Sequence, residues 1–292
     1  MRRLVGSEMC IRDSLELIYY FNLIVVRGIY MSIIEGQKIN NTFFISINNP
    51  KSKNSMVLGF HPQLQSKIDE AENSKDINSI IIFGKGGFFC AGGDLNSLKT
   101  RRDMTVPERL ETLEQLNGTI KKIKECSKPT IAAVEGGAAG AGVSLAMACD
   151  FLIMSDKSFL SLAYVKIGLT PDGGVTKLLA EVLPKQILSE MALIGDRIFA
   201  KKLFDLGFLN LISDAGEVKS DALKFSEKFK NLPQNAMFRI KTLIHHSYDN
   251  NFDEQMKLEA NLMADSQGDK ESMEGIDAFL EKRDPNFSKF RS

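Results

Sequence analysis

The stretch that most constrains the fold of this 292-residue chain is residues 136–150, with the sequence GGAAGAGVSLAMACD. Glycines and alanines lead directly into an apolar segment of helix-like composition. We therefore expect Gly140, Ala141 and Gly142 to lie at or near a helix N-terminus, where the first N–H groups lack intrahelical partners and the helix dipole favours negative charge. Backbone donors in such a turn can stabilise a developing oxyanion, each donor lowering a barrier by about 3 kcal/mol. Close packing of a helix on a strand is the alternative explanation for these small residues.

Another glycine-rich bend, the first of the two in chain order, lies within residues 80–95. Residues 80–95 read IIIFGKGGFFCAGGDL, which indicates a short β-branched strand, a glycine turn, and a further bend at Gly92 and Gly93 that ends in Asp94. One such bend is explained by steric requirements alone. Two bends, each after a strand-like run, can supply one N–H group apiece to a single carbonyl oxygen.

Three motifs then carry a family resemblance: FCAGGDL, KPTIAAVEGGAAGAGVSLAMACD and KIGLTPDGG. In this order and spacing they resemble the crotonase (enoyl-CoA hydratase/isomerase) superfamily over about residues 40–287. The full set is most similar to the branch of ring-epoxide and enoyl-CoA isomerases and of oxepin-CoA hydrolase, alternative type. The resemblance implies an α/β fold, a spiral of ββα turns whose C-terminal helices build a homotrimer or a dimer of trimers.

The resemblance also implies the substrate, an acyl-CoA thioester whose carbonyl is polarised by the amides of Gly93 and Ala141. Coenzyme A is then part of the substrate, and no separate cofactor is expected. The residues implied in binding the substrate and its CoA portion are Lys51, Ala91, Gly93, Asp94, Leu95, Asn96, Ala141 and Ser144. Alternatives remain for three of them: Lys51 as a solvated lysine, Asp94 as a turn cap, and Ser144 as a helix serine that bonds only backbone. Lys282 is implied near a CoA phosphate, and we expect Phe279 to be a packing residue.

Asp172 is the predicted catalytic acid or base. Hydratases of the family place glutamates at two positions that correspond here to Ser144 and to the neighbourhood of Ala163, so both carboxylates are absent. In family members that resemble the ring-epoxide isomerase, and in some enoyl-CoA isomerases, the acid follows the proline, as Asp172 does in GLTPDGG. A single carboxylate can take a proton from one carbon and return it two carbons away. The alternative is a turn aspartate that caps the helix beginning near Val175.

Three functions follow from this reading. The favoured one is isomerisation of an enoyl-CoA or a related ring thioester through Asp172. The second is a hydratase or an oxepin-CoA hydrolase type of activity in which Asp172 activates water. The third is a catalytically silent CoA-binding subunit.

Composition limits the other function classes. Lys and Arg total 37 and Asp and Glu total 37, so the chain has no net charge, and no basic stripe favours nucleic acid. Cys10, Cys90, Cys126 and Cys149 form no C-x-x-C pair, which predicts reduced thiols and a cytoplasmic setting. The histidines His61, His245 and His246 form no metal-ligand set. No membrane partner is expected.

The order of elements predicts an α/β core followed by a helical region. Strands are expected at residues 42–49, 77–83, 130–134, 151–155, 159–163 and 210–212, and helices at 56–71, 107–123, 143–149, 175–182, 187–193, 200–206 and 220–282. Leu110, Leu113, Leu116 and Ile120 form the predicted apolar face of the 107–123 helix. We expect a core over residues 31–212 and a C-terminal helical region over 213–292.

Residues 1–30 match nothing in the family, and their first part resembles translated adapter sequence. We expect the native protein to start at Met31, which the mass of protein from the native host tests.

Overall fold

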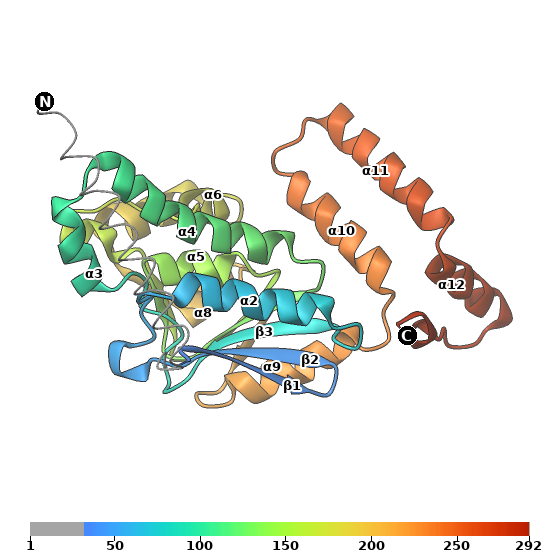
Figure 1. Ribbon diagram of the computed structural model, residues 1–292. Coiled ribbons are helices and arrows are strands. Elements are labelled where there is room, and N and C mark those ends of the chain that lie inside the picture. The colour runs from blue at the N-terminus through green and yellow to red at the C-terminus, as the bar shows by residue number, and fades with distance from the viewer. Residues whose placement is uncertain (1–31, 292) are drawn as a thin grey trace, which may run out of the picture. The chain divides into compact units, whose positions relative to one another are not determined.

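A six-stranded sheet organises residues 32–291, the part of the chain that the computed structural model describes (Figure 1). The predictions for Met31 and residues 1–30 lie outside these residues. The strand order is β1 (Ile34–Ile39), β2 (Thr42–Ile47), β3 (Ser79–Gly84), β4 (Thr130–Val134), β6 (Phe151–Ser155) and β9 (Leu211–Ser213). β1 pairs with β2 antiparallel, and every later pair in this sheet is parallel.

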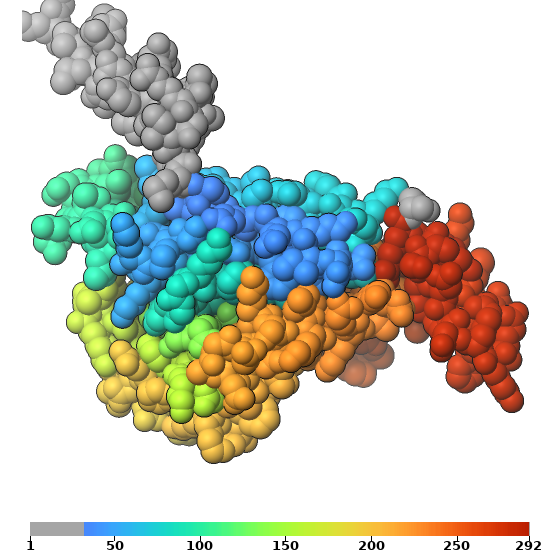
Figure 2. Space-filling view, turned by 90° about the horizontal axis from the view of Figure 1, so that it is seen from below, coloured from blue at the N-terminus to red at the C-terminus, as the bar shows by residue number. Residues whose placement is uncertain are grey.

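Both faces of this sheet are buried, which explains the continuous apolar run in β3. Ile80 and Ile82 belong to the core on the side of α2 (Phe60–Asn73) and α4 (Val106–Glu125). Ile81 points to the opposite face, where it packs with Val218 and Ala222 of α9 (Val218–Ser226). Figure 1 shows α2 and α4 on one side of the strands and α9 on the other, and Figure 2 shows the orange segment that includes α9 over this second face. A strand between two helical layers has no polar face.

A smaller sheet lies beside the first. It consists of β5 (Ala138–Ala139), β7 (Phe159–Ser161) and β8 (Arg197–Phe199), with β5 parallel and β8 antiparallel to β7. The intervening elements are η1 (Pro50–Ser52), α3 (Leu95–Thr100), η2 (Arg101–Asp103), α5 (Ala141–Met147), η3 (Ala163–Ile167), α6 (Val175–Ala180), α7 (Lys185–Ser189), the π-helix η4 (Glu190–Ile194) and α8 (Ala200–Asp205). β5 leads directly into α5, so this sheet holds the glycine–alanine turn.

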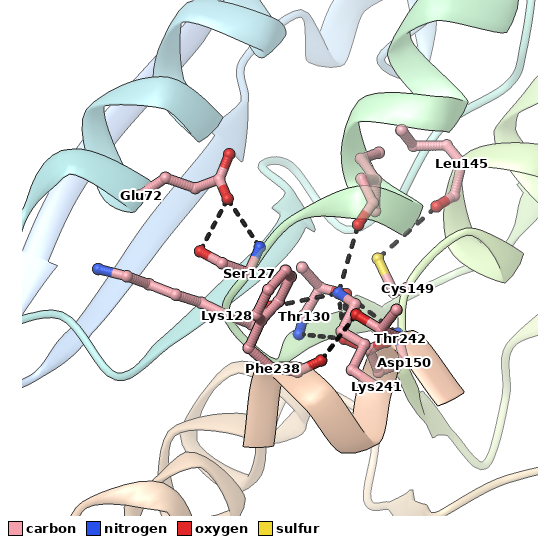
Figure 3. A network of polar contacts seen from close by, with 11 residues as sticks. Glu72, Ser127, Lys128, Thr130, Leu145, Cys149, Asp150, Phe238, Lys241 and Thr242 are labelled. Atoms are coloured by element: carbon pink, nitrogen blue, oxygen red, sulfur yellow. Dashed lines mark hydrogen bonds and ion pairs between the residues drawn. The ribbon is translucent and has the colours of Figure 1, made fainter. Parts of the chain in front are cut away.

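The chain ends in η5 (Glu227–Phe229), α10 (Gln234–His246), α11 (Phe252–Gln267), α12 (Lys270–Glu281) and η6 (Phe287–Phe290). A half-buried ion pair ties α10 to the core (Figure 3). Lys241 Nζ lies 2.7 Å from Asp150 Oδ2, and the same carboxylate oxygen accepts hydrogen bonds from the N–H and the hydroxyl of Thr130, both at 2.8 Å. The start of β4, the turn before β6 and the middle of α10 are thus held together at one carboxylate.

Most of the predicted strands and helices are confirmed, with five corrections. The segment expected to be helical over residues 220–282 forms four separate helices, α9, α10, α11 and α12. The helix expected from residue 56 begins at Phe60, because Met56 pairs instead with Gly93 in an isolated bridge. The strand at residues 159–161 belongs to the smaller sheet rather than lying beside β6. Leu110 was expected on the apolar face of α4 and is 56% exposed, and Phe279 was expected to pack and is 84% exposed within the chain.

The thiols of the described part of the chain, Cys90, Cys126 and Cys149, are unpaired, and Cys10 lies outside it. Between residues 32 and 291, no helix combines the length and the apolar character needed to cross a membrane.

Candidate active site

The two predicted glycine bends pack backbone against backbone. A Cβ atom added to Gly142 would lie 2.2 Å from the carbonyl oxygen of Cys90, and one added to Gly92 would lie 2.9 Å from the nitrogen of Ala141. Gly92 also has a φ of +84°, in the region that favours glycine. The N–H of Ala139 donates to the carbonyl of Cys90 at 3.0 Å. Only glycine at these positions allows the two bends to approach so closely.

Two backbone N–H groups at this contact have no internal hydrogen-bond partner among the described residues. α5 begins at Ala141, as predicted, and its N-cap is Gly140 with a φ of 53°. Among residues 32–291, neither the N–H of Gly93 nor that of Ala141 donates a hydrogen bond. Because Gly93 directly follows Gly92, which lies against Ala141, the two N–H groups belong to adjoining turns. Both groups are therefore available to an external acceptor.

The thiol nearest to these turns is not an alternative nucleophile. Cys90 is fully buried, and this burial raises the pKa of its thiol to about 12. A thiol with that pKa stays protonated at neutral pH.

Asn54 fastens the loop that carries Lys51 to the glycine turn that follows β3. The amide of this fully buried residue donates to the carbonyls of Lys85 at 2.9 Å and Phe88 at 2.6 Å and accepts from the N–H of Asn49 at 2.8 Å. Lys51 itself is exposed on η1. The N–H of Ala91 donates to the carbonyl of Lys53 at 3.0 Å, so Ala91 and the η1 loop are neighbours.

Asp94 caps the helix that follows the first bend, which agrees with the local alternative given for it. Its carboxylate accepts hydrogen bonds from the N–H of Ser97 at 2.8 Å and from the Ser97 hydroxyl at 3.0 Å. Leu95 and Asn96 lie in the first turn of α3, and both are exposed. The roles of these residues and of Lys51 toward CoA stay predictions.

Asp172 lies next to the second bend, and its side chain does not cap α6. The N-cap of α6 is Gly174, which makes no side-chain cap bond. The Asp172 carboxylate instead accepts a hydrogen bond from the Tyr164 hydroxyl at 2.7 Å. The Ser144 hydroxyl donates to the main-chain carbonyl of Asp172 at 3.0 Å. Tyr164 therefore links η3 to the Asp172 carboxylate, and Ser144 links the first turns of α5 to the Asp172 main chain.

The charge state of Asp172 is set by opposing effects. Partial burial raises the pKa of its carboxyl above the ordinary value, while the Tyr164 hydrogen bond and the positive charge of Arg101 lower it. No second carboxylate of the described chain contributes to this pKa shift. A carboxyl group of raised pKa in a half-buried position is suited to accepting and returning a proton.

His61 lies at the start of α2 and contacts α4. Its Nδ1 lies 3.1 Å from the hydroxyl of Thr119 on α4. Burial, followed by the charge of Arg101, lowers the pKa of His61 to about 4, so the ring is neutral at pH 7. Arg101 thus influences both His61 and Asp172 from η2.

Tyr164 is the site residue that sequence reasoning missed. The second family glutamate position is expected near Ala163, and the adjoining residue, Tyr164, is the one that contacts the acid. A tyrosine beside an expected carboxylate position was the available signal. The Tyr164 ring also lies beside Gly140, since a Cβ added to Gly140 would lie 3.7 Å from it. Gly140 and Tyr164 are distant in sequence, so only the structure shows this contact.

Known proteins resemble this chain over nearly all of the described residues. A family model described as enoyl-CoA hydratase/isomerase matches residues 37–290. The chain is 29% identical over 245 residues to 1,2-epoxyphenylacetyl-CoA isomerase of Escherichia coli (strain K12), covering 84% of this chain and 94% of that protein. It is 31% identical over 247 residues to a probable enoyl-CoA hydratase of Bacillus subtilis (strain 168), covering 83% of this chain and 93% of that protein.

The fold is shared with a solved structure. The crystal structure of an enoyl-CoA hydratase from Polaromonas sp. JS666 has a TM-score of 0.83 and 36% sequence identity to this chain, covering 87% of this chain and 98% of that one. These likenesses confirm the predicted fold class.

Proposed function

The chain belongs to the enoyl-CoA hydratase/isomerase family, and we propose that within it the protein isomerises an unsaturated acyl-CoA thioester, by moving a double bond or rearranging a ring. The observation that carries the proposal is Asp172, a half-buried carboxylate hydrogen-bonded beside the second glycine turn. The two positions where family hydratases have glutamates hold Ser144 and the Ala163 neighbourhood, which lack carboxylates.

The reaction needs two functions from these residues. The N–H groups of Gly93 and Ala141 receive the thioester oxygen and stabilise the negative charge that develops on it. Asp172 removes a proton from one carbon to give a dienolate and returns that proton two carbons away. Atoms balance without water, since the same proton leaves and re-enters the substrate.

The CoA portion of the substrate is assigned to the segments that flank the first glycine bend. Lys51 on the exposed η1 offers a positive charge to a phosphate. Ala91, Asp94, Leu95 and Asn96 form the adjoining bend and the first turn of α3. No cofactor besides the substrate's own CoA enters the mechanism.

Water addition or hydrolysis is the second candidate activity, with Asp172 activating a water molecule. The similarity to enoyl-CoA hydratases from Polaromonas sp. JS666 and Bacillus subtilis favours it. In this case a nucleophilic water enters the product, and the same oxyanion amides stabilise the enolate.

Product analysis separates the two activities. Purified protein is incubated with 3-enoyl-CoA and 2-enoyl-CoA thioesters, aliphatic and aromatic, and products are resolved by chromatography and mass. A shifted double bond with unchanged mass supports the proposal. A 3-hydroxyacyl product, heavier by one water, supports the hydratase. Binding of every thioester without conversion of any supports the silent CoA-binding subunit.

We also propose a homotrimer, or a dimer of trimers, built through the C-terminal helices. Large apolar side chains of α10, α11 and α12 are exposed in the single chain, as Ile244, Met263, Ile276 and Leu280 are. Exposed apolar groups in such numbers are typical of a surface that another subunit covers. Light scattering after size-exclusion chromatography tests the assembly.

The unpaired thiols support a reducing, cytoplasmic setting.

A further inference from the structure

We propose that Tyr164 is a positioning residue that fixes one oxygen of the Asp172 carboxylate and leaves the other to exchange the proton with substrate. This inference rests on the proposed function of Asp172. It assigns a role to a residue that carries no carboxylate itself and acts through its phenol hydroxyl.

Tyr164 lies between the turn at Gly140 and the Asp172 carboxylate. Its side chain belongs to η3 and is buried, with 9% of the residue exposed. The hydroxyl donates to Asp172 Oδ1 at 2.7 Å, and it also lies 3.9 Å from the position that a Cβ on Gly140 would occupy. The Tyr164 hydroxyl therefore contacts the Asp172 carboxylate and also lies close to Gly140, the residue before Ala141.

This contact distinguishes the two carboxylate oxygens. Oδ1 is engaged by the phenol, whereas Oδ2 accepts no side-chain hydrogen bond from the described residues. The Ser144 hydroxyl holds the Asp172 main chain at the carbonyl oxygen. With its backbone and one oxygen fixed, the carboxylate keeps a single orientation, and Oδ2 remains as the base. Positioning of this kind lowers the entropy cost of reaching the reactive geometry.

The same hydrogen bond favours the ionised form of Asp172. Three groups favour the ionised carboxyl: the Tyr164 hydroxyl on η3, the charge of Arg101 on η2 and the backbone N–H of Asp172 itself. Ser144 of α5 bonds only the main-chain carbonyl of Asp172. Burial opposes ionisation, and the phenol hydrogen bond is the largest effect that counters it. A donor that stabilises the carboxylate keeps the base ready before it meets substrate.

The matched test is Tyr164→Phe, which removes the hydroxyl and keeps the ring. The isomerase rate is measured against pH on a 3-enoyl-CoA substrate, in parallel with Tyr248→Phe, whose tyrosine is exposed. We expect the acidic limb of kcat/KM to move up by about one pH unit in Tyr164→Phe. Below that limb kcat falls about tenfold, KM changes little, and activity recovers at higher pH. Tyr248→Phe keeps the wild-type profile.

A double variant keeps this inference separate from the proposed function. If Tyr164 acts only through Asp172, Tyr164→Phe adds no loss to Asp172→Asn. An unchanged pH profile in Tyr164→Phe, with Asp172→Asn inactive, overturns the positioning role and leaves Asp172 as the base. Full activity of Asp172→Asn overturns both. A loss in Tyr164→Phe that is equal at every pH, with a lowered unfolding temperature, also rejects the role, because it indicates packing alone.

Discussion

The hydroxyl of Ser144 donates a hydrogen bond to the main-chain carbonyl of Asp172 at 3.0 Å. Ser144 is fully buried in the first turns of α5, the helix that begins at Ala141. One helix therefore carries the Ala141 N–H at its first residue and holds the loop of Asp172 three residues later. Gly173 also lies against Ser144, so the Asp172 loop is packed on the same helix that carries the Ala141 N–H.

Ser144→Ala removes this link. We expect kcat to fall about tenfold, because a displaced acid loses reactive geometry, and the free energy of unfolding to fall by about 1 kcal/mol for the lost hydrogen bond. Steady-state kinetics and urea unfolding measure the two effects. Ser247→Ala is the control, since the Ser247 hydroxyl makes an exposed local bond to the Ile244 carbonyl. Unchanged kcat in Ser144→Ala contradicts the link.

Gly142→Ala tests the contact between the two glycine bends. The added Cβ would meet the Cys90 carbonyl at 2.2 Å, so the bends must separate. We expect a loss of about 2 kcal/mol in unfolding free energy and a loss of activity, as the Gly93 and Ala141 amides move apart.

Gly118→Ala is the matched control for that substitution. Gly118 lies inside α4, and a Cβ there would meet only the end of Gln65 at 3.7 Å. Alanine is favoured over glycine in a helix, so we expect this variant to gain up to about 1 kcal/mol and to keep its activity. Equal stability of the two variants contradicts the close approach at Gly142.

Lys241→Met tests the attachment of α10 to the core. The substitution leaves the half-buried Asp150 without its cationic partner, and we expect unfolding free energy to fall by about 2 kcal/mol. Lys201→Met removes a pair with Asp205 whose side chains are 80% and 59% exposed, and we expect it to change stability by less than about 0.5 kcal/mol. Chemical denaturation compares them. Equal effects reject the role of the Lys241 pair.

Asp172→Asn has an expected consequence for stability as well as for activity. The pKa of Asp172 is raised in the folded chain by burial, so the folded state holds the proton more tightly than the unfolded one. The carboxyl therefore costs stability that increases as pH rises from its unfolded pKa through its folded pKa. At neutral pH we expect Asp172→Asn to be more stable than wild type, with the difference shrinking toward pH 4. Denaturation at several pH values measures this, and a less stable Asp172→Asn at pH 7 disagrees with it.

Most of the core elements were predictable because their apolar runs are buried. The run that forms β3 and the segment of β4 are examples. β1 was not predicted, because it lies at the sheet edge, and only Ile34 of its six residues is buried. β8 escaped notice for a similar reason, since it has three residues and only its central Ile198 is buried. Short or edge strands carry too little periodic signal.

In the site too, the features set by adjacent residues were predictable, and the contacts between distant segments were not. The turn at Ala141 and the glycine bend at Gly92 follow from adjacent residues and were predicted. A turn cap was the alternative given for Asp94, and α3, the helix that it caps, was not predicted. The contact of Tyr164 with Asp172 and the anchoring of the η1 loop by Asn54 join segments through the fold. Apolar character predicted burial of Leu110 and Phe279, yet both are exposed in the single chain, because individual apolar side chains also occur on protein surfaces.

In the proposed mechanism, one carboxylate moves the proton while the main-chain amides stabilise the enolate. The most direct measurement is turnover of a 3-enoyl-CoA by Asp172→Asn, with acyl-CoA affinity measured in parallel by calorimetry. We expect double-bond migration to fall by at least about a thousandfold while affinity stays within about threefold of wild type. Wild-type turnover in Asp172→Asn contradicts it.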